Sequence, residues 1–134
     1  MFKDFSSKYH RILITGGSGF IGSNLISKLL KNSDCKIFNI DKMGYASDET
    51  NINNSLTECN KENYHLLKLD LINEKEVDEA FKFIKPDLVM HLAAESHVDR
   101  SIEGPKVFLE SNIMGTFNLL QSSLSYFNSS LISN

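Results

Sequence analysis

An excess of positive charge, a framework of cysteines and a long apolar run are all missing from this sequence of 134 residues. Its 14 Lys and Arg side chains are outnumbered by 17 Asp and Glu side chains, so the chain offers no broad positive field for nucleic acid or an anionic membrane. The two cysteines, Cys35 and Cys59, form no C-x-x-C motif. Free thiols in a reducing compartment are therefore expected.

Membrane and export signals are absent as well. The longest apolar stretches reach about half the length that a bilayer span needs, and residues 1–9 are polar without an apolar signal core. Hydrophobic residues at 41% and charged residues at 23% are typical of a globular domain. We expect a cytoplasmic protein with a short N-terminal extension at 1–9, followed by one domain that binds neither nucleic acid nor membrane.

Short apolar runs alternate with amphipathic stretches along the chain. Four strands separated by crossovers of helix length predict right-handed βαβ units and a parallel sheet. The expected fold is α/β, of Rossmann type, with helices on both faces and an incomplete sheet of four strands in the order 3-2-1-4. Strands are expected at 11–15, 36–40, 65–69 and 87–92, helices at 20–31, 74–85 and 105–127, and polar stretches at 42–63 and 128–134.

Apolar residues three and four positions apart predict which face each helix buries. The three expected faces are Ile21, Leu25 and Leu29 in the first helix, Val77, Ala80, Phe81 and Ile84 in the second, and Ile113, Phe117, Leu120 and Leu124 in the third.

A glycine-rich loop joins the first strand to the first helix. Gly16, Gly19 and Gly22 recur at three-residue spacing, although a trio of glycines alone is weak evidence because glycines also mark ordinary turns. Here the trio follows a strand and opens a helix, which is the setting of a dinucleotide-binding fingerprint. Missing side chains allow a tight turn and a close approach of pyrophosphate to the N–H groups of the helix start.

An acidic residue follows the second strand. Asp41 comes 19 residues after Gly22, where a carboxylate can accept both ribose hydroxyls of adenosine and repel a 2′-phosphate, so NAD is expected rather than NADP. Lys42 beside it weakens that preference slightly. The plainer interpretation is a solvated carboxylate that opens a loop, but the loop, strand and spacing together favour dinucleotide binding. Asp70, after the third strand, either accepts the adenine amino group or serves as an N-terminal acid of the next helix.

The segment after the fourth strand changes from apolar to dense in titratable groups. Because the carboxyl ends of parallel strands line the ligand crevice of such sheets, we expect a site here. Small residues at Ala93 and Ala94 would let ribose or nicotinamide approach the backbone. Ser96 and His97 are candidates for hydrogen bonds to substrate or cofactor.

A plainer interpretation of this segment is a loop held by its own Asp99–Arg100 pair, although Arg100 is also a candidate partner for a substrate phosphate. His91 lies inside the strand and is expected to be a core histidine rather than a ligand. His10 and His65 lie away from this edge and are expected to be surface or packing residues. No spacing of His, Cys, Asp and Glu suggests a metal site.

Three stretches carry a family resemblance: TGGSGFIGS at 15–23, NIDKMGYAS at 39–47 and VMHLAAESHVDRSIEGP at 89–105. They resemble the extended short-chain dehydrogenase/reductase family of NAD-dependent epimerases and dehydratases, and most of all its dTDP-glucose 4,6-dehydratases. The third stretch is the most specific, because related epimerases and decarboxylases usually differ through ESHVDRS. The residues Glu110-Ser111-Asn112 with Gly115-Thr116 are a fourth match, and the resemblance covers residues 10–127.

The resemblance implies contacts for each part of NAD. Pyrophosphate would lie at the glycine loop and helix start, adenosine at Asp41 and the residues after it, adenine at Asp70, and nicotinamide beside 92–96. The family usually has threonine where Gly44 stands, so this chain lacks a hydroxyl there. It often has threonine where Ser111 stands, and serine keeps that hydroxyl. The implied cofactor residues are Gly16, Gly19, Phe20, Ile21, Gly22, Asp41, Lys42, Met43, Gly44, Asp70, Leu71, Leu92, Ala93, Ala94, Glu95, Ser96 and Ser111, with Ser96 and His97 also toward the substrate.

The family's catalytic segments are not matched. Its members continue, after the part that this sequence matches, with a Ser-Thr-Asp-Glu segment, a Tyr-x-x-x-Lys pair and a sugar-nucleotide-binding domain. The Tyr-x-x-x-Lys spacing of Tyr64 and Lys68 lies at the predicted third strand, well before the family's pair. The resemblance thus implies a truncated NAD-binding domain at 10–134, without a substrate domain or catalytic residues and inactive alone. Full-length members commonly form homodimers through helices of this domain. Residues 105–127 and a helix beyond the match would take part, so a homodimer is not expected of this chain alone.

The function implied is that of a lyase that acts on a nucleotide sugar such as dTDP-glucose. Such an enzyme oxidises C4 by hydride transfer to NAD, eliminates water across C5 and C6, and returns the hydride to C6. Two alternatives stay open: a stand-alone NAD-binding module without catalysis, and a fragment of another nucleotide-sugar epimerase or decarboxylase.

Overall fold

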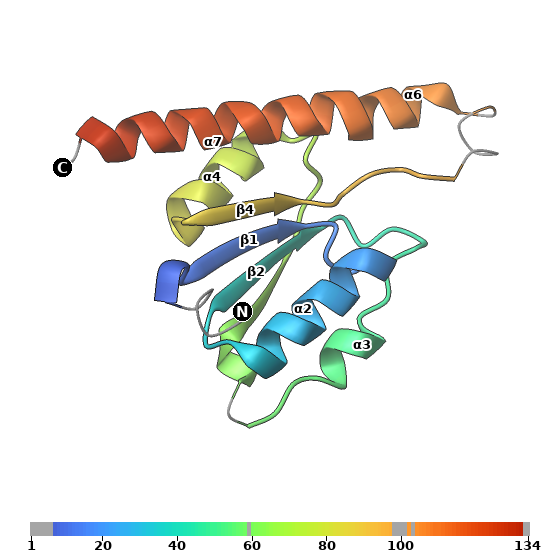
Figure 1. The fold of residues 1–134 in the computed structure, drawn as a ribbon. Coiled ribbons are helices and arrows are strands. Elements are labelled where there is room, and N and C mark those ends of the chain that lie inside the picture. The colour runs from blue at the N-terminus through green and yellow to red at the C-terminus, as the bar shows by residue number, and fades with distance from the viewer. Residues whose placement is uncertain (1–6, 59, 98–101, 103, 133–134) are drawn as a thin grey trace. The chain divides into compact units, whose positions relative to one another are not determined.

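The computed structural model describes residues 7–58, 60–97, 102 and 104–132. They belong to two compact units, one formed by residues up to 68 together with 86–93, the other by 69–85 together with the residues from 94 onward. The first unit contains the sheet and the second contains the long C-terminal helix (Figure 1).

A four-stranded parallel sheet forms the centre of the first unit. Its order, β3-β2-β1-β4, confirms the expected topology. The first strand has the expected bounds, the second extends one residue further, the third lies one residue earlier, and the fourth is one residue shorter at each end. The strands are β1 (Arg11–Thr15), β2 (Lys36–Asp41), β3 (Tyr64–Lys68) and β4 (Leu88–His91).

The core of the first unit lies between the sheet and helix α2 (Phe20–Asn32). Alternate residues of the central strands face this helix, as the two-residue period of a strand requires. The helix face differs from the expected one: Leu29 is buried and Leu25 is half-buried, but Ile21 is 69% exposed. The buried face is centred on Gly22 and Ile26 instead, because Gly22 packs against the backbone of the preceding loop. The core cluster comprises Ile12, Ile14, Ile26, Leu29, Leu30, Cys35, Ile37 and Ile52.

The polar connection at 42–63 is more structured than its composition suggests. It contains the short helix α3 (Thr50–Asn53) and the 3-10 turn η1 (Lys61–Asn63). Ile52 of α3 is fully buried and anchors the connection in the core cluster. Cys35 is a free, buried thiol, whereas Cys59 lies outside the described residues.

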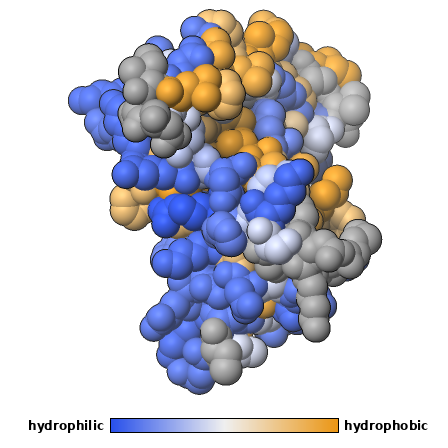
Figure 2. All heavy atoms as spheres, turned by 60° about the vertical axis from the view of Figure 1, so that its left-hand side comes forward, coloured by the Kyte–Doolittle hydropathy of each residue, from blue (hydrophilic) through white to orange (hydrophobic). Residues whose placement is uncertain are grey.

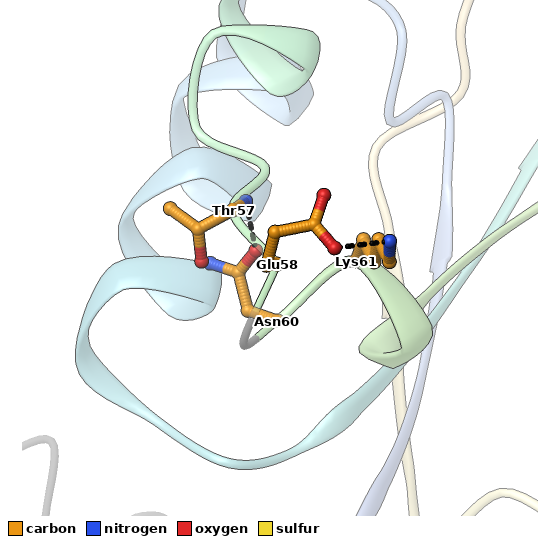
Figure 3. A network of polar contacts seen from close by, with 4 residues as sticks. All are labelled: Thr57, Glu58, Asn60 and Lys61. Atoms are coloured by element: carbon orange, nitrogen blue, oxygen red, sulfur yellow. Dashed lines mark hydrogen bonds and ion pairs between the residues drawn. The ribbon is translucent and has the colours of Figure 1, made fainter.

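A small polar network closes this connection before β3 (Figure 3). The N–H of Thr57 donates to Oδ1 of Asn60 at 2.6 Å, and Lys61 pairs with Glu58 at 2.5 Å. The amide of Asn60 also donates to the carbonyl oxygen of Leu30 at 3.1 Å. Leu30 lies in the last turn of α2, where no N–H of the helix can donate to its carbonyl. Asn60 supplies that missing donor.

The second unit consists of helices. The predicted buried face of α4 (Glu74–Ile84) is confirmed in full. This helix packs against α7 (Gly115–Ile132), where the rings of Phe81 and Tyr126 are 5.9 Å apart and the Ser122 hydroxyl donates to Asp78 at 2.5 Å. The C-terminal run comprises α6 (Pro105–Phe108), the π-helical turn η2 (Leu109–Met114) and α7 (Gly115–Ile132).

The prediction for the C-terminal helix is wrong in two respects. The helix continues to residue 132, through most of the expected polar tail. Its supposed buried face is exposed, with exposed fractions of 58% at Ile113, 52% at Phe117, 63% at Leu120 and 55% at Leu124. The residues that are buried instead include Asn118, Leu119 and Ser122.

Together with Leu109, Phe127 and Leu131, those four side chains form an apolar stripe along the helix. Figure 2 shows exposed apolar side chains gathered in its upper part. Despite this stripe, no helix in the described part of the chain combines the length and the hydropathy needed to cross a bilayer.

Candidate functional site

The first three N–H groups of the glycine loop donate hydrogen bonds to residues of β2. Gly16 N–H donates to the carbonyl of Ile40 at 2.8 Å and Gly17 N–H donates to Oδ1 of Asn39 at 2.9 Å. Ser18 N–H donates to Oδ2 of Asp41 at 3.0 Å. These bonds fix the loop against the end of β2, and the N–H of Gly19 donates to the carbonyl of Gly16 at 3.2 Å.

The N–H groups that follow open helix α2. Within the described residues, the N–H groups of Phe20, Ile21 and Gly22 have no acceptor, and no side chain caps the helix. The Phe20 side chain is 85% exposed, so this end of the helix faces solvent. Free N–H groups at the positive end of a helix dipole bind anions, and the first turn carries no acidic residue that would repel one.

Two glycines of the loop cannot carry a side chain. Gly16 has φ +69°, and a Cβ there would lie 2.5 Å from Cα of Ala93. A Cβ on Gly22 would lie 2.4 Å from the carbonyl oxygen of Gly16. Both distances are far inside van der Waals contact with backbone atoms, so the close approach of β1, α2 and the chain after β4 depends on glycine.

Asp41 is buried and forms several hydrogen bonds, which excludes the interpretation of a solvated carboxylate. Besides Ser18 N–H, it accepts the N–H of Met43 at 2.8 Å and the hydroxyl of Ser47 at 2.9 Å, both on Oδ1. A carboxylate offers about four acceptor positions. About one position therefore remains for a ligand unless Ser47 moves aside.

The residues after Asp41 form a turn. Met43 has φ +57° and is half-buried, while Lys42 and Gly44 are exposed. A Cβ on Gly44 would meet only Cε of Lys42, at 3.6 Å. The position therefore has room for a Cβ, unlike Gly16 and Gly22.

The ends of β1 and β4 are joined by a side-chain pair. The Thr15 hydroxyl oxygen lies 2.6 Å from Nδ1 of His91 and also accepts the N–H groups of Leu92 and Ala93 at 3.3 and 3.4 Å. Burial lowers the pKa of His91, which favours the neutral ring. His91 is thus a half-buried residue with a hydrogen-bond partner, as expected. His65 is exposed and stacks on Phe38, and His10 is also exposed, so both are surface or packing residues.

In the second unit, Asp70 and Leu71 form a turn before α4. The Asp70 carboxylate accepts the N–H of Ile72 at 3.1 Å, and the helix cap is Asn73, not Asp70. The amide of Asn118 donates to the carbonyls of Leu71 and Ile72, each at 2.9 Å. These bonds explain why the polar side of α7 faces inward, contrary to the prediction.

The segment at 94–97 is held by the same helical run. Asn112 in η2 accepts the N–H of Glu95 at 2.8 Å and donates to its carbonyl at 2.9 Å, as a neighbouring strand would. Ala94, Ser96 and His97 are exposed, and Glu95 and Ser111 are half-buried. Val98 to Ser101, with the Asp99–Arg100 pair, lie outside the described residues.

The predicted site residues are therefore divided between the two units. The second unit holds Asp70, Leu71, Ala94, Glu95, Ser96, His97 and Ser111. The first unit brings together Gly16, Gly19, Phe20, Ile21, Gly22, Asp41, Lys42, Met43, Gly44, Leu92 and Ala93.

Sequence reasoning missed the residues that hold these segments in place. Asn39 had a readable signal, because it is the one polar residue between Ile37 and Ile40 in a buried strand. Asn112 and Asn118 had a weaker signal. They lie in a helical run with many polar residues, and the sequence alone does not distinguish the polar side chains that hold other segments from those that face solvent. The described residues contain no cluster of His, Cys, Asp and Glu that could hold a metal ion.

Comparison with known proteins places the chain in a family. The sequence model of the GDP-mannose 4,6 dehydratase family matches residues 13–130. The dTDP-glucose 4,6-dehydratase of Salmonella typhimurium is 45% identical over 87% of this chain, and that of Neisseria meningitidis is 44% identical over 87%. The chain spans about a third of the length of these relatives, 31% and 32%.

Solved structures agree with this assignment. The dTDP-glucose 4,6-dehydratase DesIV of Streptomyces venezuelae, crystallised with NAD, matches 87% of this chain with a TM-score of 0.74 and 32% identity. The UDP-glucose 4-epimerase of Thermus thermophilus, also a complex with NAD, matches 87% with a TM-score of 0.72 and 29% identity. The chain covers 36% and 34% of these two proteins.

Proposed function

The chain belongs to the GDP-mannose 4,6 dehydratase family of nucleotide-sugar dehydratases and epimerases, and from this premise we propose that it binds NAD as the dinucleotide-binding part of a dTDP-glucose 4,6-dehydratase. In such an enzyme the nicotinamide accepts a hydride from the sugar and later returns it. The proposal concerns what this chain's own residues do for the cofactor.

The observation that carries the proposal is the set of free N–H groups at Phe20, Ile21 and Gly22. They open a helix directly after a loop whose own N–H groups are already bonded, so an incoming anion meets donors fixed in position. The missing Cβ atoms at Gly16 and Gly22 keep the backbone accessible and closely packed. We assign the pyrophosphate of NAD to this helix start.

Asp41 supports the choice of cofactor. Its carboxylate ends β2 and keeps about one acceptor position beyond its three protein donors. A ribose hydroxyl can donate to it, whereas the 2′-phosphate of NADP would face a buried negative charge. We therefore propose NAD rather than NADP, with the adenosine beside the turn at 42–44.

The remaining contacts rest on the family relationship. We propose that Asp70 and Leu71 contact the adenine, that 92–96 line the nicotinamide side, and that Ser96 and His97 approach the nucleotide sugar. Ser111 would make a further contact with the cofactor. For the whole protein we propose 4,6-dehydration of a sugar nucleotide, with dTDP-glucose as the substrate. The relatives at 44–45% identity support that choice over an epimerase.

The test is calorimetric titration of the purified chain with NAD, with NADP as the comparison. We expect binding of NAD alone, and about 10- to 100-fold weaker binding in Asp41→Ala, the range expected for losing a hydrogen bond to a charged group. Asp34→Ala, which removes an exposed carboxylate of the same unit, is the matched control. Absence of NAD binding by the folded wild-type chain would overturn the proposal. Binding without any turnover after the rest of the dehydratase is supplied would favour a stand-alone NAD-binding module.

A further inference from the structure

Four side chains beside the glycine loop form a closed ring of hydrogen bonds. The amide nitrogen of Asn39 donates to the hydroxyls of Ser18, at 3.0 Å, and Tyr64, at 3.1 Å. Both hydroxyls donate to the same oxygen, Oε1 of Glu49, at 3.2 and 2.5 Å. The ring thereby joins the loop, β2, the connection at 42–63 and β3, all within the first unit.

The direction of every hydrogen in the ring is determined. An amide nitrogen can only donate, so each hydroxyl accepts one hydrogen bond from the Asn39 amide. Each hydroxyl in turn donates a hydrogen bond to Glu49. The ring closes only where Glu49 presents an oxygen that accepts twice. Burial and the hydrogen bond to Glu49 raise the pKa of Tyr64, so the phenol keeps the hydrogen that it donates.

The ring also fixes which way the Asn39 side chain points. With its nitrogen turned to Ser18 and Tyr64, its oxygen is left to accept Gly17 N–H at 2.9 Å. Asn39 and Ser18 are both fully buried, so a rotated amide would leave buried donors and acceptors without partners. The connection at 42–63 contacts Ser18 at a second point, because the Ser18 carbonyl accepts the N–H of Asp48 at 2.7 Å.

On the basis of the proposed function, we propose that Glu49 and Tyr64 are positioning residues for the dinucleotide. Neither residue belongs to the glycine loop or the helix start. They lock the amide of Asn39, which holds Gly17 and Ser18, and so keep the N–H groups at the start of α2 fixed for the pyrophosphate. Glu49 makes the polar connection at 42–63 part of the cofactor site's framework.

The test compares four variants of the full chain by NAD calorimetry and by amide hydrogen exchange without ligand. Glu49→Ala and Tyr64→Phe each break the ring, whereas Glu49→Gln keeps an oxygen that accepts twice. Glu62→Ala removes an exposed carboxylate and is the control. We expect a three- to tenfold higher Kd for NAD in the first two variants and a change below about twofold in the other two.

Hydrogen exchange supplies a readout that a general loss of stability does not reproduce. In Glu49→Ala and Tyr64→Phe the amides of Gly17 and Ser18 should exchange faster, while those of Ile12 and Ile14 in β1 keep their wild-type protection. Tyr64→Phe removes only one hydroxyl. If Glu49→Ala folds poorly, the Kd and exchange rates of Tyr64→Phe test the positioning role.

The outcomes separate the two proposals. Equal Kd values in the wild type and all variants would overturn the positioning role and leave the proposed function intact. A wild-type chain that does not bind NAD would overturn the proposed function and, with it, the positioning role. Failure of Glu49→Gln to retain wild-type affinity would also contradict the ring, because it would show that charge and not the accepting oxygen matters.

Discussion

The hydroxyl of Thr15 and the imidazole of His91 meet 2.6 Å apart where the two neighbouring strands β1 and β4 end. Thr15 Oγ1 also lies within hydrogen-bond distance of the N–H groups of Leu92 and Ala93, and its hydroxyl can donate to Nδ1 when the His91 ring is neutral and carries its hydrogen on Nε2. The pair connects the strand that leads into the glycine loop with the strand that leads into the segment at 92–96.

Burial of His91 makes stability depend on pH. Burial lowers the pKa of His91 in the folded chain, so the unfolded chain binds more protons below about pH 6.5, the ordinary histidine value. Above about pH 6.5 the neutral ring makes its full contribution to the free energy of unfolding. Below pH 6.5 this free energy should fall as the pH approaches the lowered pKa of His91. Urea unfolding between pH 5 and 8 measures this fall. An unchanged pH profile in His91→Gln would contradict the assignment.

Gly22→Ala should disrupt the glycine loop. The new methyl group would lie 2.4 Å from the carbonyl oxygen of Gly16, so the loop or α2 must shift. We expect a loss of about 1–3 kcal/mol in the free energy of unfolding, as for other overpacked positions, together with loss of NAD binding. Gly44→Ala is the matched control for the free energy of unfolding alone, since its Cβ meets only Cε of Lys42 at 3.6 Å, whereas the turn at 42–44 belongs to the proposed NAD site. A tolerated Gly22→Ala would show that the close approach is not required.

Ser47→Ala should strengthen NAD binding. The Ser47 hydroxyl donates to Oδ1 of Asp41 at 2.9 Å and so competes with a ribose hydroxyl for the same acceptor. Removing one ordinary hydrogen bond changes the balance by about 0.5–1.5 kcal/mol, which predicts an increase in affinity of about two- to tenfold. Calorimetry with NAD measures it, with Ser7→Ala, an exposed serine, as the control. Weaker binding in Ser47→Ala would instead indicate that Ser47 helps to orient the carboxylate.

Two adjacent leucines of α7 should respond differently to truncation. Leu119 is 3% exposed and Leu120 is 63% exposed. Leu119→Ala should lower the free energy of unfolding by about 2–5 kcal/mol through the cavity that it leaves, whereas Leu120→Ala should change it by no more than about 0.5 kcal/mol. Urea unfolding of both variants at several protein concentrations is the measurement. A large, concentration-dependent loss in Leu120→Ala would show that the apolar stripe is covered by a second copy.

The sheet was predictable because buried strands and glycine turns leave local marks in the sequence. Runs such as 12–14 contain only apolar residues, and the crossover rule then limits the order of the strands. The face of α4 was predictable for a related reason: apart from the exposed Phe83, its apolar residues form a single stripe. The fold thus followed from patterns that repeat within a few residues.

The face of α7 was not predictable by the same method. The stripe through Phe117 and Leu120 exists, but the buried side is chosen by hydrogen bonds from Asn118 to the turn at 71–72. Such bonds join residues more than 40 positions apart. Glu49 illustrates the same limit at the site, since its partners Ser18 and Tyr64 come from other elements and its own segment has no period. The contacting residues of the loop were therefore visible in the sequence, while those that orient them were not.

The position of β1 between β2 and β4 has a consequence for synthesis. Its partner on one side follows within the next few dozen residues, but its partner on the other side comes 76 residues later, as the separation of Thr15 and His91 shows. At a translation rate of about 5–20 residues per second, β1 is exposed on that side for several seconds on the ribosome. The residues of α4 are made during this interval, between β3 and β4. The first unit therefore completes its sheet only after part of the second unit has already emerged.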